Sequence, residues 1–398
     1  MDNYQFMSDK LRTLEAQGNL RRLPQVRFEG RYALSPEGRR MLNLSSNDYL
    51  GLAADEELRS EFLATLGSAT FRPTSSSSRL LTGNWPVYDE LEAELARLYG
   101  REAALTFGSG YHANAGILPA VADARTLILA DKLVHASLID GIRLAAPARA
   151  IRYRHNDLGQ LERLLDEYCA TYERVIEVTE SVFSMDGDRA DLSALVDLKR
   201  RHAGVLLYVD EAHAFGVYGP TGLGCAEQAG CVGEIDFLVG TFGKAAASAG
   251  AFVVCDEVVR RYLVNRARTF IFTTALPPVC AAWTLFVVRR LAALGERRSR
   301  LQRISNEVCR AVADAGLACP SQSHIVPVIT GDSPAAVRLA DAMQEHGFYV
   351  LPVRPPTVPQ GASRVRLSLT ADLTPEEAGR LALALRQSCA AAASGVRQ

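Results

Sequence analysis

The segment Val205-Leu-Leu-Tyr-Val209-Asp210-Glu211-Ala212-His213 is an apolar run that ends in an acidic residue, with a histidine three positions later. A nearly continuous apolar run of this length predicts a strand that is covered on both faces. In open parallel sheets, ligands bind at the carboxyl ends of the strands. Asp210 could therefore face a ligand, but aspartate is also favoured at the N-terminal cap of a helix. This segment alone leaves both interpretations open.

Further apolar runs of the same kind occur on either side of this segment. They cover residues 103–107, 127–130, 175–178, 237–239 and 251–254. Between them, apolar residues recur at helical spacing, as in Leu91, Leu95 and Leu98. The spacing of Leu192, Leu195, Val196 and Leu198 also fits a helix. Strands that alternate with helices predict an α/β fold with a mainly parallel sheet.

The last hundred residues have a different pattern, which predicts a smaller α+β domain. We expect strands at 325–329, 348–353 and 365–369 and a helix over 334–345. A final helix should begin at Thr374, with Pro375 at its first position and Glu377 completing a capping box. The predicted domains are an N-terminal segment (1–50), a large domain that carries the candidate site (51–288) and a small C-terminal domain (289–398).

A lysine follows the apolar run at 237–239, in Gly240-Thr241-Phe-Gly243-Lys244-Ala245. Its neighbours are small and apolar, and burial of this kind lowers the pKa of an amine, as a Schiff-base lysine requires. A phosphate-binding P-loop is excluded, because Leu238 replaces its first glycine and Ala245 replaces its serine or threonine. A structural lysine that reaches solvent is the remaining alternative.

A glycine-containing turn joins the run at 103–107 to a helix, in Gly108-Ser-Gly110-Tyr111-His-Ala113-Asn114. The N-terminus of such a helix binds anions. Ala113 breaks the G-x-G-x-x-G pattern, so a single phosphate is a more economical ligand than a dinucleotide. An acid at a strand end, a buried lysine and a phosphate site together fit pyridoxal 5'-phosphate (PLP).

The overall charge excludes some classes of partner. The chain has 398 residues, with Lys+Arg 44, Asp+Glu 45 and a net charge of -1. There is no basic surplus to drive binding to nucleic acid or to an anionic membrane. The polar stretch from Met1 to Gly18 lacks the apolar centre of a secretory signal. We therefore expect a soluble, cytoplasmic protein.

Two further features bear on membrane and metal binding. Residues 271–288 carry no charge, but Pro277-Pro278 interrupts them, which predicts a buried turn and then a buried helix rather than a membrane span. The 8 cysteines are scattered without a C-x-x-C pair, as expected of reduced cysteines in a cytosolic protein. Neither zinc nor a disulfide framework is indicated.

Several motifs together resemble the α-oxoamine synthases, a fold-type I family of PLP-dependent enzymes, over nearly the whole chain. They are Ser45-Ser-Asn-Asp-Tyr-Leu-Gly51-Leu52, Ser78-Arg79-Leu-Leu-Thr-Gly83, Asp131-Lys-Leu-Val-His135-Ala-Ser137, Thr179-Glu-Ser-Val-Phe-Ser184-Met-Asp186-Gly187-Asp188, Asp210-Glu-Ala-His213 and Gly240-Thr-Phe-Gly-Lys244. Because they follow the order of the family, they are more specific together than any one of them.

The resemblance implies roles for individual residues. Lys244 would bind PLP as a Schiff base and act as the catalytic base, with Asp210 on the pyridine nitrogen and His135 stacked on the ring. Other cofactor contacts are implied for Gly110, Tyr111, Ser184, His213 and Thr241, and for Thr273 and Thr274 towards the phosphate of the neighbouring subunit. Substrate contacts are implied for Arg21, Asn47, His135, Thr357 and Arg366, the last of which would hold the amino-acid carboxylate. The family is therefore expected to form an obligate homodimer with its active site at the subunit interface.

Within the family, Arg354-Pro355-Pro356-Thr357-Val358-Pro359 resembles the branch that condenses L-alanine with a pimeloyl thioester, of CoA or acyl carrier protein, in biotin synthesis. A related synthase that uses glycine and another acyl-CoA is the first alternative. A non-catalytic subunit is disfavoured by the intact Lys244, Asp210 and His135, and a Rossmann dehydrogenase by the glycine pattern.

Two departures from the family pattern lie close to the expected cofactor site and could alter the acyl pocket. Ser75–Ser78 replaces a glycine-rich stretch, and Trp85 and Tyr88 stand in a region where histidine is frequent. These changes bear on substrate identity more than on reaction type.

Overall fold

A computed structural model describes residues 3–68 and 70–394, and the side chains of residues 389–394, Cys389 among them, lie outside the description. The chain divides into two compact units. The large unit comprises residues 50–184 and 188–299, and the small unit comprises the described parts of 1–49, 185–187 and 300–398. Compact units need not fold independently, so the division into 1–50, 51–288 and 289–398 stays a prediction.

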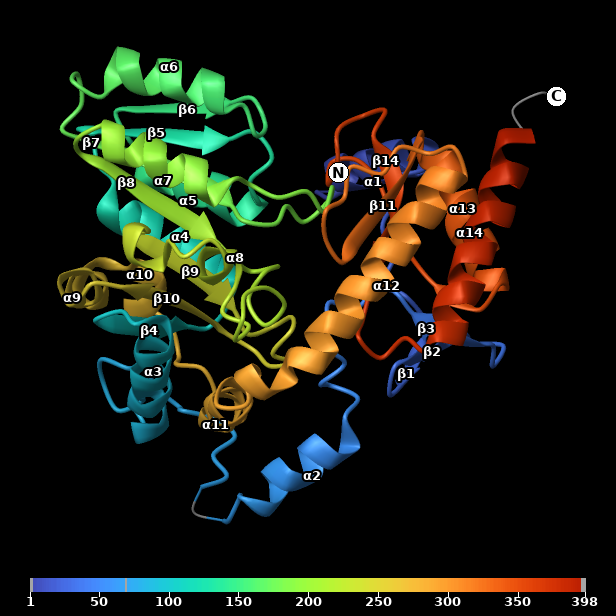
Figure 1. Cartoon of the computed structure of the whole chain (residues 1–398), viewed down its shortest axis with the longest axis horizontal. Helices are drawn as coiled ribbons and strands as arrows, with labels where there is room; N and C mark the ends of the chain where they lie inside the picture. The colour runs from blue at the N-terminus through green and yellow to red at the C-terminus, as the bar shows by residue number, and fades with distance from the viewer. Residues whose placement is uncertain (1–2, 69, 395–398) are drawn as a thin grey trace. The chain divides into compact units, whose positions relative to one another are not determined.

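The large unit is built around one seven-stranded sheet (Figure 1). In spatial order its strands are β4 (Ala103–Phe107), β10 (Ala251–Cys255), β9 (Phe237–Thr241), β8 (Val205–Asp210), β7 (Arg174–Glu180), β5 (Thr126–Asp131) and β6 (Arg149–Tyr153). Strands β9, β8, β7, β5 and β6 pair in parallel, whereas β10 is antiparallel to both of its neighbours. The prediction of a mainly parallel sheet is therefore confirmed.

Helices cover the faces of this sheet. The helices of the large unit are α2 (Glu56–Ala64), α3 (Pro86–Tyr99), α4 (Gly110–Val121), α5 (Ala136–Ala145), α6 (Leu158–Tyr168), α7 (Leu192–Arg201), α8 (Cys225–Gln228), α9 (Glu257–Arg266), α10 (Arg268–Ile271) and α11 (Pro278–Val288). In Figure 1, α7 lies in front of the sheet and α4 behind it. Fully buried residues such as Ile128, Val178 and Val253 belong to the core cluster of the sheet.

The uncharged segment at 271–288 forms the turn and helix that its prolines predict. The chain leaves α10 at Ile271, and Pro278 occupies the first turn of α11, most of whose apolar residues are buried or half-buried. Among the described residues, no single helix is long and apolar enough to span a membrane. Residues 278–288 and 291–314 meet the length and composition test only as a pair bent by 61°.

The small unit contains two small sheets. One has the order β1 (Arg27–Glu29), β2 (Tyr32–Leu34), β3 (Arg40–Asn43) and β12 (Phe348–Tyr349), and the other has the order β11 (Ile325–Gly331), β14 (Ser363–Ser368) and β13 (Pro352–Val353). Its helices are α1 (Gln5–Ala16), α13 (Ser333–Glu345), α14 (Pro375–Ser394) and most of α12 (Gly295–Asp314).

Two predictions for this unit have different outcomes. The single strand expected at 348–353 is wrong, because β12 pairs with β3 and β13 pairs with β14. Proline has no N–H to donate to a ladder, and Pro352 begins the separate edge strand β13. The capping box at the start of α14 is confirmed: the N–H of Thr374 donates to Glu377 Oε2 at 2.9 Å, and the N–H of Glu377 donates to Thr374 Oγ1 at 3.2 Å.

The carboxyl ends of four neighbouring strands deliver polar residues to one edge of the large sheet. Strand β5 ends at Asp131, β7 at Glu180, β8 at Asp210 and β9 at Thr241. Glu180 and Asp210 are aligned partners in the β7–β8 ladder, and Asp210 is aligned with Val239 of β9. This edge is where ligands bind in open parallel sheets.

Candidate active site

A cavity of about 200 Å³ lies at this edge of the large unit. Its lining residues are Gly110, Tyr111, Asn114, His135, Ser137, Glu180, Asp210, Ala212, His213, Thr241 and Lys244. The lining comes from the carboxyl ends of β7, β8 and β9, from the N-termini of α4 and α5, and from the turn after β9. The structure thus brings together seven of the predicted cofactor residues.

Asp210 is buried at the end of β8 and is held by two donors. The Asn114 amide donates to its Oδ2 at 2.7 Å, and the N–H of Ala212 donates to its Oδ1 at 2.8 Å. Each carboxylate oxygen therefore accepts a hydrogen bond, which fixes the orientation of the side chain. The aspartate at this strand end faces the cavity and caps no helix.

Glu180 is the second buried carboxyl group at the sheet edge. Burial raises its pKa well above the usual range, and the charge of the adjacent Asp210 raises it further. Two neighbouring buried carboxyl groups do not both ionise readily. These two effects favour the neutral form of Glu180, although Lys244 and the backbone N–H of His135, which donates to Oε1 at 2.5 Å, oppose them.

Lys244 lies in the turn that follows β9. Phe242, Ala245 and Ala246 around it are fully buried, which fixes the path of the backbone and turns the lysine towards the cavity. Its Nζ lies 2.9 Å from His213 Nε2. At the start of this turn, Thr241 Oγ1 donates to the carbonyl of Gly250 at 2.9 Å.

The N-terminus of α4 forms another wall of the cavity. The Ser109 hydroxyl caps the helix by accepting the N–H of His112 at 3.1 Å. The backbone N–H groups of Gly110 and Tyr111 belong to the first turn, where an α-helix provides no intrahelical acceptor. Tyr111 is exposed here and donates its hydroxyl to Asp140 at 2.7 Å, a contact that raises the pKa of Tyr111. Amides at a helix start are suited to a phosphate.

His135 is the N-terminal cap of α5, and its Nδ1 accepts the backbone N–H of Ser137 at 3.2 Å. Although its side chain is exposed in the single chain, the groups packed around it lower its pKa. Desolvation is the largest cause, Asp210 opposes it and Lys244 adds to it. The imidazole is therefore biased towards its neutral form.

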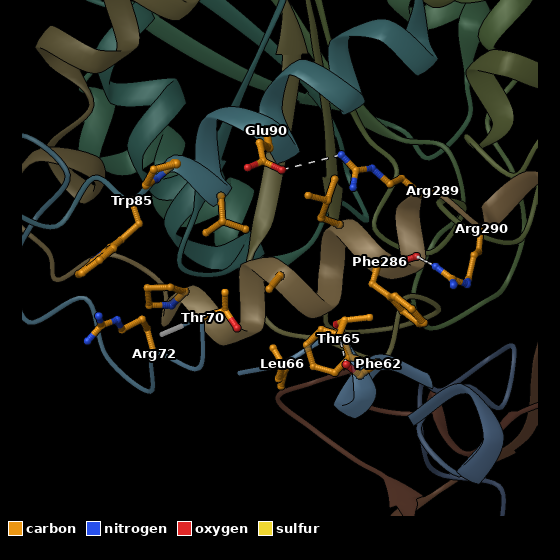
Figure 2. A pocket seen from close by; sticks show the side chains of 15 residues that line it. Phe62, Thr65, Leu66, Thr70, Arg72, Trp85, Glu90, Phe286, Arg289 and Arg290 are labelled. Atoms are coloured by element: carbon orange, nitrogen blue, oxygen red, sulfur yellow. Dashed lines mark hydrogen bonds and ion pairs between the residues drawn. The ribbon is translucent and has the colours of Figure 1, made fainter. Parts of the chain in front are cut away.

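The donor set fits PLP. A primary amine can bind an aldehyde, a buried carboxylate can pair a pyridine nitrogen, and a helix start can take a phosphate, and the cavity holds all three. A second cavity, of about 510 Å³, lies in the same unit between α2, α3 and α11 (Figure 2). Aromatic side chains and Arg72, Arg289 and Arg290 line it, with neither lysine nor histidine among its described residues, so it lacks the chemistry for this cofactor.

Four of the five predicted substrate residues lie in the small unit, where the structure brings them together in two pairs, whereas His135 lies in the large unit. Arg366 on β14 donates to Asn47 Oδ1 at 3.3 Å, and the same oxygen accepts the Tyr49 hydroxyl at 3.0 Å. Arg21 donates to Thr357 Oγ1 at 2.9 Å.

Three predicted cofactor residues lie outside the cavity lining. Ser184 follows β7, and Thr273 and Thr274 lie between α10 and α11. Thr273 Oγ1 donates to the Thr274 carbonyl at 3.4 Å. The expected contacts of Thr273 and Thr274 with a neighbouring subunit stay a prediction. Among the described residues there is no group of three or more His, Cys, Asp or Glu side chains that could hold a metal ion.

Three residues that the sequence motifs do not predict as site residues also line the cavity, namely Asn114, Ser137 and Glu180. Each has a signal in the sequence. Asn114 lies four residues after Gly110, on the same face of α4. Ser137 follows the His135 cap by two positions, and Glu180 ends an apolar strand as Asp210 does.

Comparisons with known proteins agree with this geometry. A family model described as aminotransferase class I and II matches residues 39–385. A protein of Pasteurella multocida (strain Pm70), named "Putative 8-amino-7-oxononanoate synthase", is 54% identical over 383 residues, which are 96% of this chain and 98% of the relative.

Two solved structures have the same fold. A serine palmitoyltransferase variant from S. paucimobilis, with a bound PLP–myriocin aldimine, has a TM-score of 0.88 at 28% identity and covers 98% of each chain. An 8-amino-7-oxononanoate synthase from Francisella tularensis has a TM-score of 0.74 at 27% identity, over 88% of this chain and 98% of its own. The predicted α/β class of fold-type I transferases is confirmed.

Proposed function

The chain belongs to the class I and II aminotransferase family, within its α-oxoamine synthase branch, and on that basis we propose that it condenses L-alanine with a pimeloyl thioester. The products would be 8-amino-7-oxononanoate, CO2 and the free thiol, a step of biotin synthesis. The chain is a PLP-dependent acyltransferase, and PLP is its cofactor.

One observation carries this proposal. Lys244 Nζ lies 2.9 Å from His213 Nε2 in a cavity that also contains the buried Asp210 and the neutral-biased His135. An amine, a buried carboxylate and an imidazole that converge at the carboxyl edge of a parallel sheet support cofactor chemistry at this place.

Lys244, Asp210 and the start of α4 would hold the cofactor through its aldehyde, its pyridine nitrogen and its phosphate, respectively. When bound, PLP supplies an electron sink for the negative charge that develops at the amino-acid Cα. Asp210 would keep a proton on the pyridine nitrogen, because its ionised carboxylate is fixed by Asn114 and Ala212. The Nζ of Lys244, once released, would remove the Cα proton of alanine as a general base.

The substrates would be held by other residues. Arg366 would bind the alanine carboxylate, for which a guanidinium provides paired donors. The alanine Cα then forms a bond to the thioester carbon, the thiol leaves, and the carboxylate departs as CO2 before Cα is protonated again. His135 would donate a hydrogen bond to the thioester carbonyl oxygen. Arg21, Asn47 and Thr357 would contribute to the substrate pocket.

We also propose that the enzyme is a cytoplasmic homodimer. Thr273 and Thr274 resemble residues that reach the phosphate of the neighbouring subunit in the family. Such contacts would complete each active site with residues of the other chain.

The test is identification of the product by mass spectrometry after incubation of the PLP-loaded enzyme with an amino acid and pimeloyl-CoA. We expect 8-amino-7-oxononanoate from alanine and slower thiol release with glycine or serine. A preference for glycine would assign the chain to a glycine-dependent synthase, and a preference for serine would also contradict the proposal. A parallel reaction with pimeloyl-acyl carrier protein compares the two acyl carriers.

A further inference from the structure

A continuous chain of hydrogen bonds connects the wall of the cavity with His135. The Tyr208 hydroxyl donates to Asn114 Oδ1 at 2.7 Å, and Asn114 Nδ2 donates to Asp210 at 2.7 Å and to Ser137 Oγ at 2.9 Å. Ser137 Oγ lies 2.7 Å from His135 Nδ1. Tyr208, Asn114 and Ser137 are at most 1% exposed, so their polar atoms depend on one another for partners.

Asp210 determines which group donates and which accepts along this series of hydrogen bonds. An ionised carboxylate only accepts hydrogen bonds, so the Asn114 group that faces it is the amide nitrogen. The amide oxygen then faces Tyr208, whose hydroxyl donates to it. Tyr208 and Asp210 together hold the amide against rotation, and its second N–H points at Ser137.

Ser137 is the member of the series that hydrogen-bonds with the imidazole of His135. A hydroxyl has one hydrogen to donate, and because Ser137 Oγ already accepts from Asn114, its own hydrogen is available for His135 Nδ1. The backbone N–H of Ser137 can only donate, and it also points at Nδ1, at 3.2 Å. Both groups require a lone pair on Nδ1, which places the proton of the neutral ring on Nε2.

We propose that Ser137 is a positioning residue that holds His135 as its neutral Nε2–H tautomer, under the direction of Asn114, Tyr208 and Asp210. His135 would then present a hydrogen-bond donor, and no lone pair, to a substrate oxygen. The tautomer follows from the hydrogen bonds alone, whereas its use on a thioester carbonyl rests on the proposed function.

The tautomer can be measured in the PLP-loaded enzyme with ¹⁵N-labelled histidine. The His135 ring signals are identified by their loss in His135→Asn. At neutral pH we expect Nδ1 to resonate as an unprotonated nitrogen and Nε2 as a protonated one. A protonated Nδ1, or an equal mixture of tautomers, would overturn the proposal.

Variants test which residue sets the tautomer. Ser137→Ala should move the two ring signals part of the way towards averaged positions, because it keeps only the backbone N–H that points at Nδ1. Ser137→Thr should keep them as in the wild type because it retains the hydroxyl. Tyr208→Phe releases the Asn114 amide and should shift the same signals if Ser137→Ala does not fold. If Ser137→Ala folds and its His135 signals stay unchanged, the role of this series of hydrogen bonds is refuted. If Ser137→Ala does not fold, unchanged signals in Tyr208→Phe refute it.

Kinetics separate this inference from the proposed function. Ser137→Ala should lower kcat by about tenfold, the cost of one hydrogen bond, without a matching rise in KM for the amino acid. Ser305→Ala, which removes a buried hydroxyl that donates to the Leu301 carbonyl in the small unit, should leave kcat unchanged. A normal kcat in Ser137→Ala would refute the positioning role. If alanine gives no product but the ring signals are as expected, the proposed substrate fails and the tautomer stands.

Discussion

Asp210 and Glu180 are adjacent buried carboxyl groups with different surroundings. Asp210 has two donors, whereas burial and the charge of Asp210 raise the pKa of Glu180. These surroundings favour the neutral form of Glu180, so that Asp210 is the carboxylate that would pair with the pyridine nitrogen of PLP. The sequence shows that an acidic residue ends this strand and so reaches the sheet edge. It does not show the hydrogen-bond donors of Asp210, because Asn114 on α4 is distant in sequence and the other donor is a backbone N–H, which every residue except proline has.

The first prediction concerns Asp210→Asn. The amide cannot hold a proton on the pyridine nitrogen, so kcat should fall by about 10²–10³-fold, as when one preorganised electrostatic partner is removed. Steady-state thiol release measures the rate, and circular dichroism shows that the fold is intact. Asp157→Asn is the matched control, because asparagine also caps a helix well and Asp157 caps α6. A near-normal rate in Asp210→Asn would remove its proposed role.

The second prediction concerns Glu177, which is fully buried and has no hydrogen-bond partner for either oxygen among the described residues. Burial raises its pKa from 4.5 to about 8, with a small opposing effect of Lys199. Between these two pH values the unfolded chain releases this proton and the folded chain keeps it. The contribution of Glu177 to the free energy of unfolding therefore falls by about 1.4 kcal/mol per pH unit as pH rises.

Glu177→Gln should remove this part of the pH dependence. The unfolding temperature of the variant, relative to wild type, should increase from pH 5 to pH 8 in scanning calorimetry. Glu57→Gln, at an exposed position, should show no such trend. A difference between Glu177→Gln and wild type that is constant with pH would mean that Glu177 is already ionised in the folded protein.

At the scale of elements, apolar runs predict six of the seven strands of the large sheet and miss β6. The run at 103–107 coincides with β4, and those at 175–178 and 205–209 lie within β7 and β8. Strand β6 was not predicted, because it is an edge strand whose Arg149 and Arg152 interrupt the apolar pattern. An apolar run reports burial on both faces. All residues of the edge strand β4 are buried, whereas in the edge strand β6 only Tyr153 is.

The third prediction tests the capping box of α14. Thr374→Ala removes the acceptor for the N–H of Glu377 and should lower the free energy of unfolding by about 1 kcal/mol. Glu377 also pairs with Arg31 at 2.8 Å, so the cap contributes to packing within the small unit. Thr13→Ala on the exposed face of α1 is the control. Equal unfolding temperatures for Thr374→Ala and wild type would show that the cap adds nothing.

At the scale of the whole molecule, the sequence specifies the cofactor site more completely than the substrate site. Lys244, Asp210 and His213 belong to short motifs at strand ends, and one sheet edge brings them together. Apart from His135, the substrate residues come from separate segments of the small unit, as in Arg21 with Thr357 and Asn47 with Arg366. No local sequence pattern predicts such pairs, and only the resemblance to a family indicates these residues.

The fourth prediction is that the enzyme is a dimer in solution. The chain has a mass of 43.2 kDa, so sedimentation equilibrium should give about twice that value at the concentrations used for assays. Replacing both Thr273 and Thr274 by valine should weaken PLP retention, measured by dialysis and absorbance, without changing the mass. An active species with the mass of one chain would contradict the shared active site.

Lys244 is the residue proposed to bind the cofactor aldehyde, and the low lysine content of the chain makes this assignment easy to test. The sequence contains four lysines, Lys10, Lys132, Lys199 and Lys244, so the other three act as internal controls. Borohydride reduction of the PLP-loaded enzyme, followed by proteolysis and mass spectrometry, should find the reduced PLP adduct on the peptide that contains Lys244 and on no other lysine. An adduct on Lys10, Lys132 or Lys199 instead, or an unmodified Lys244 in fully loaded enzyme, would contradict the account.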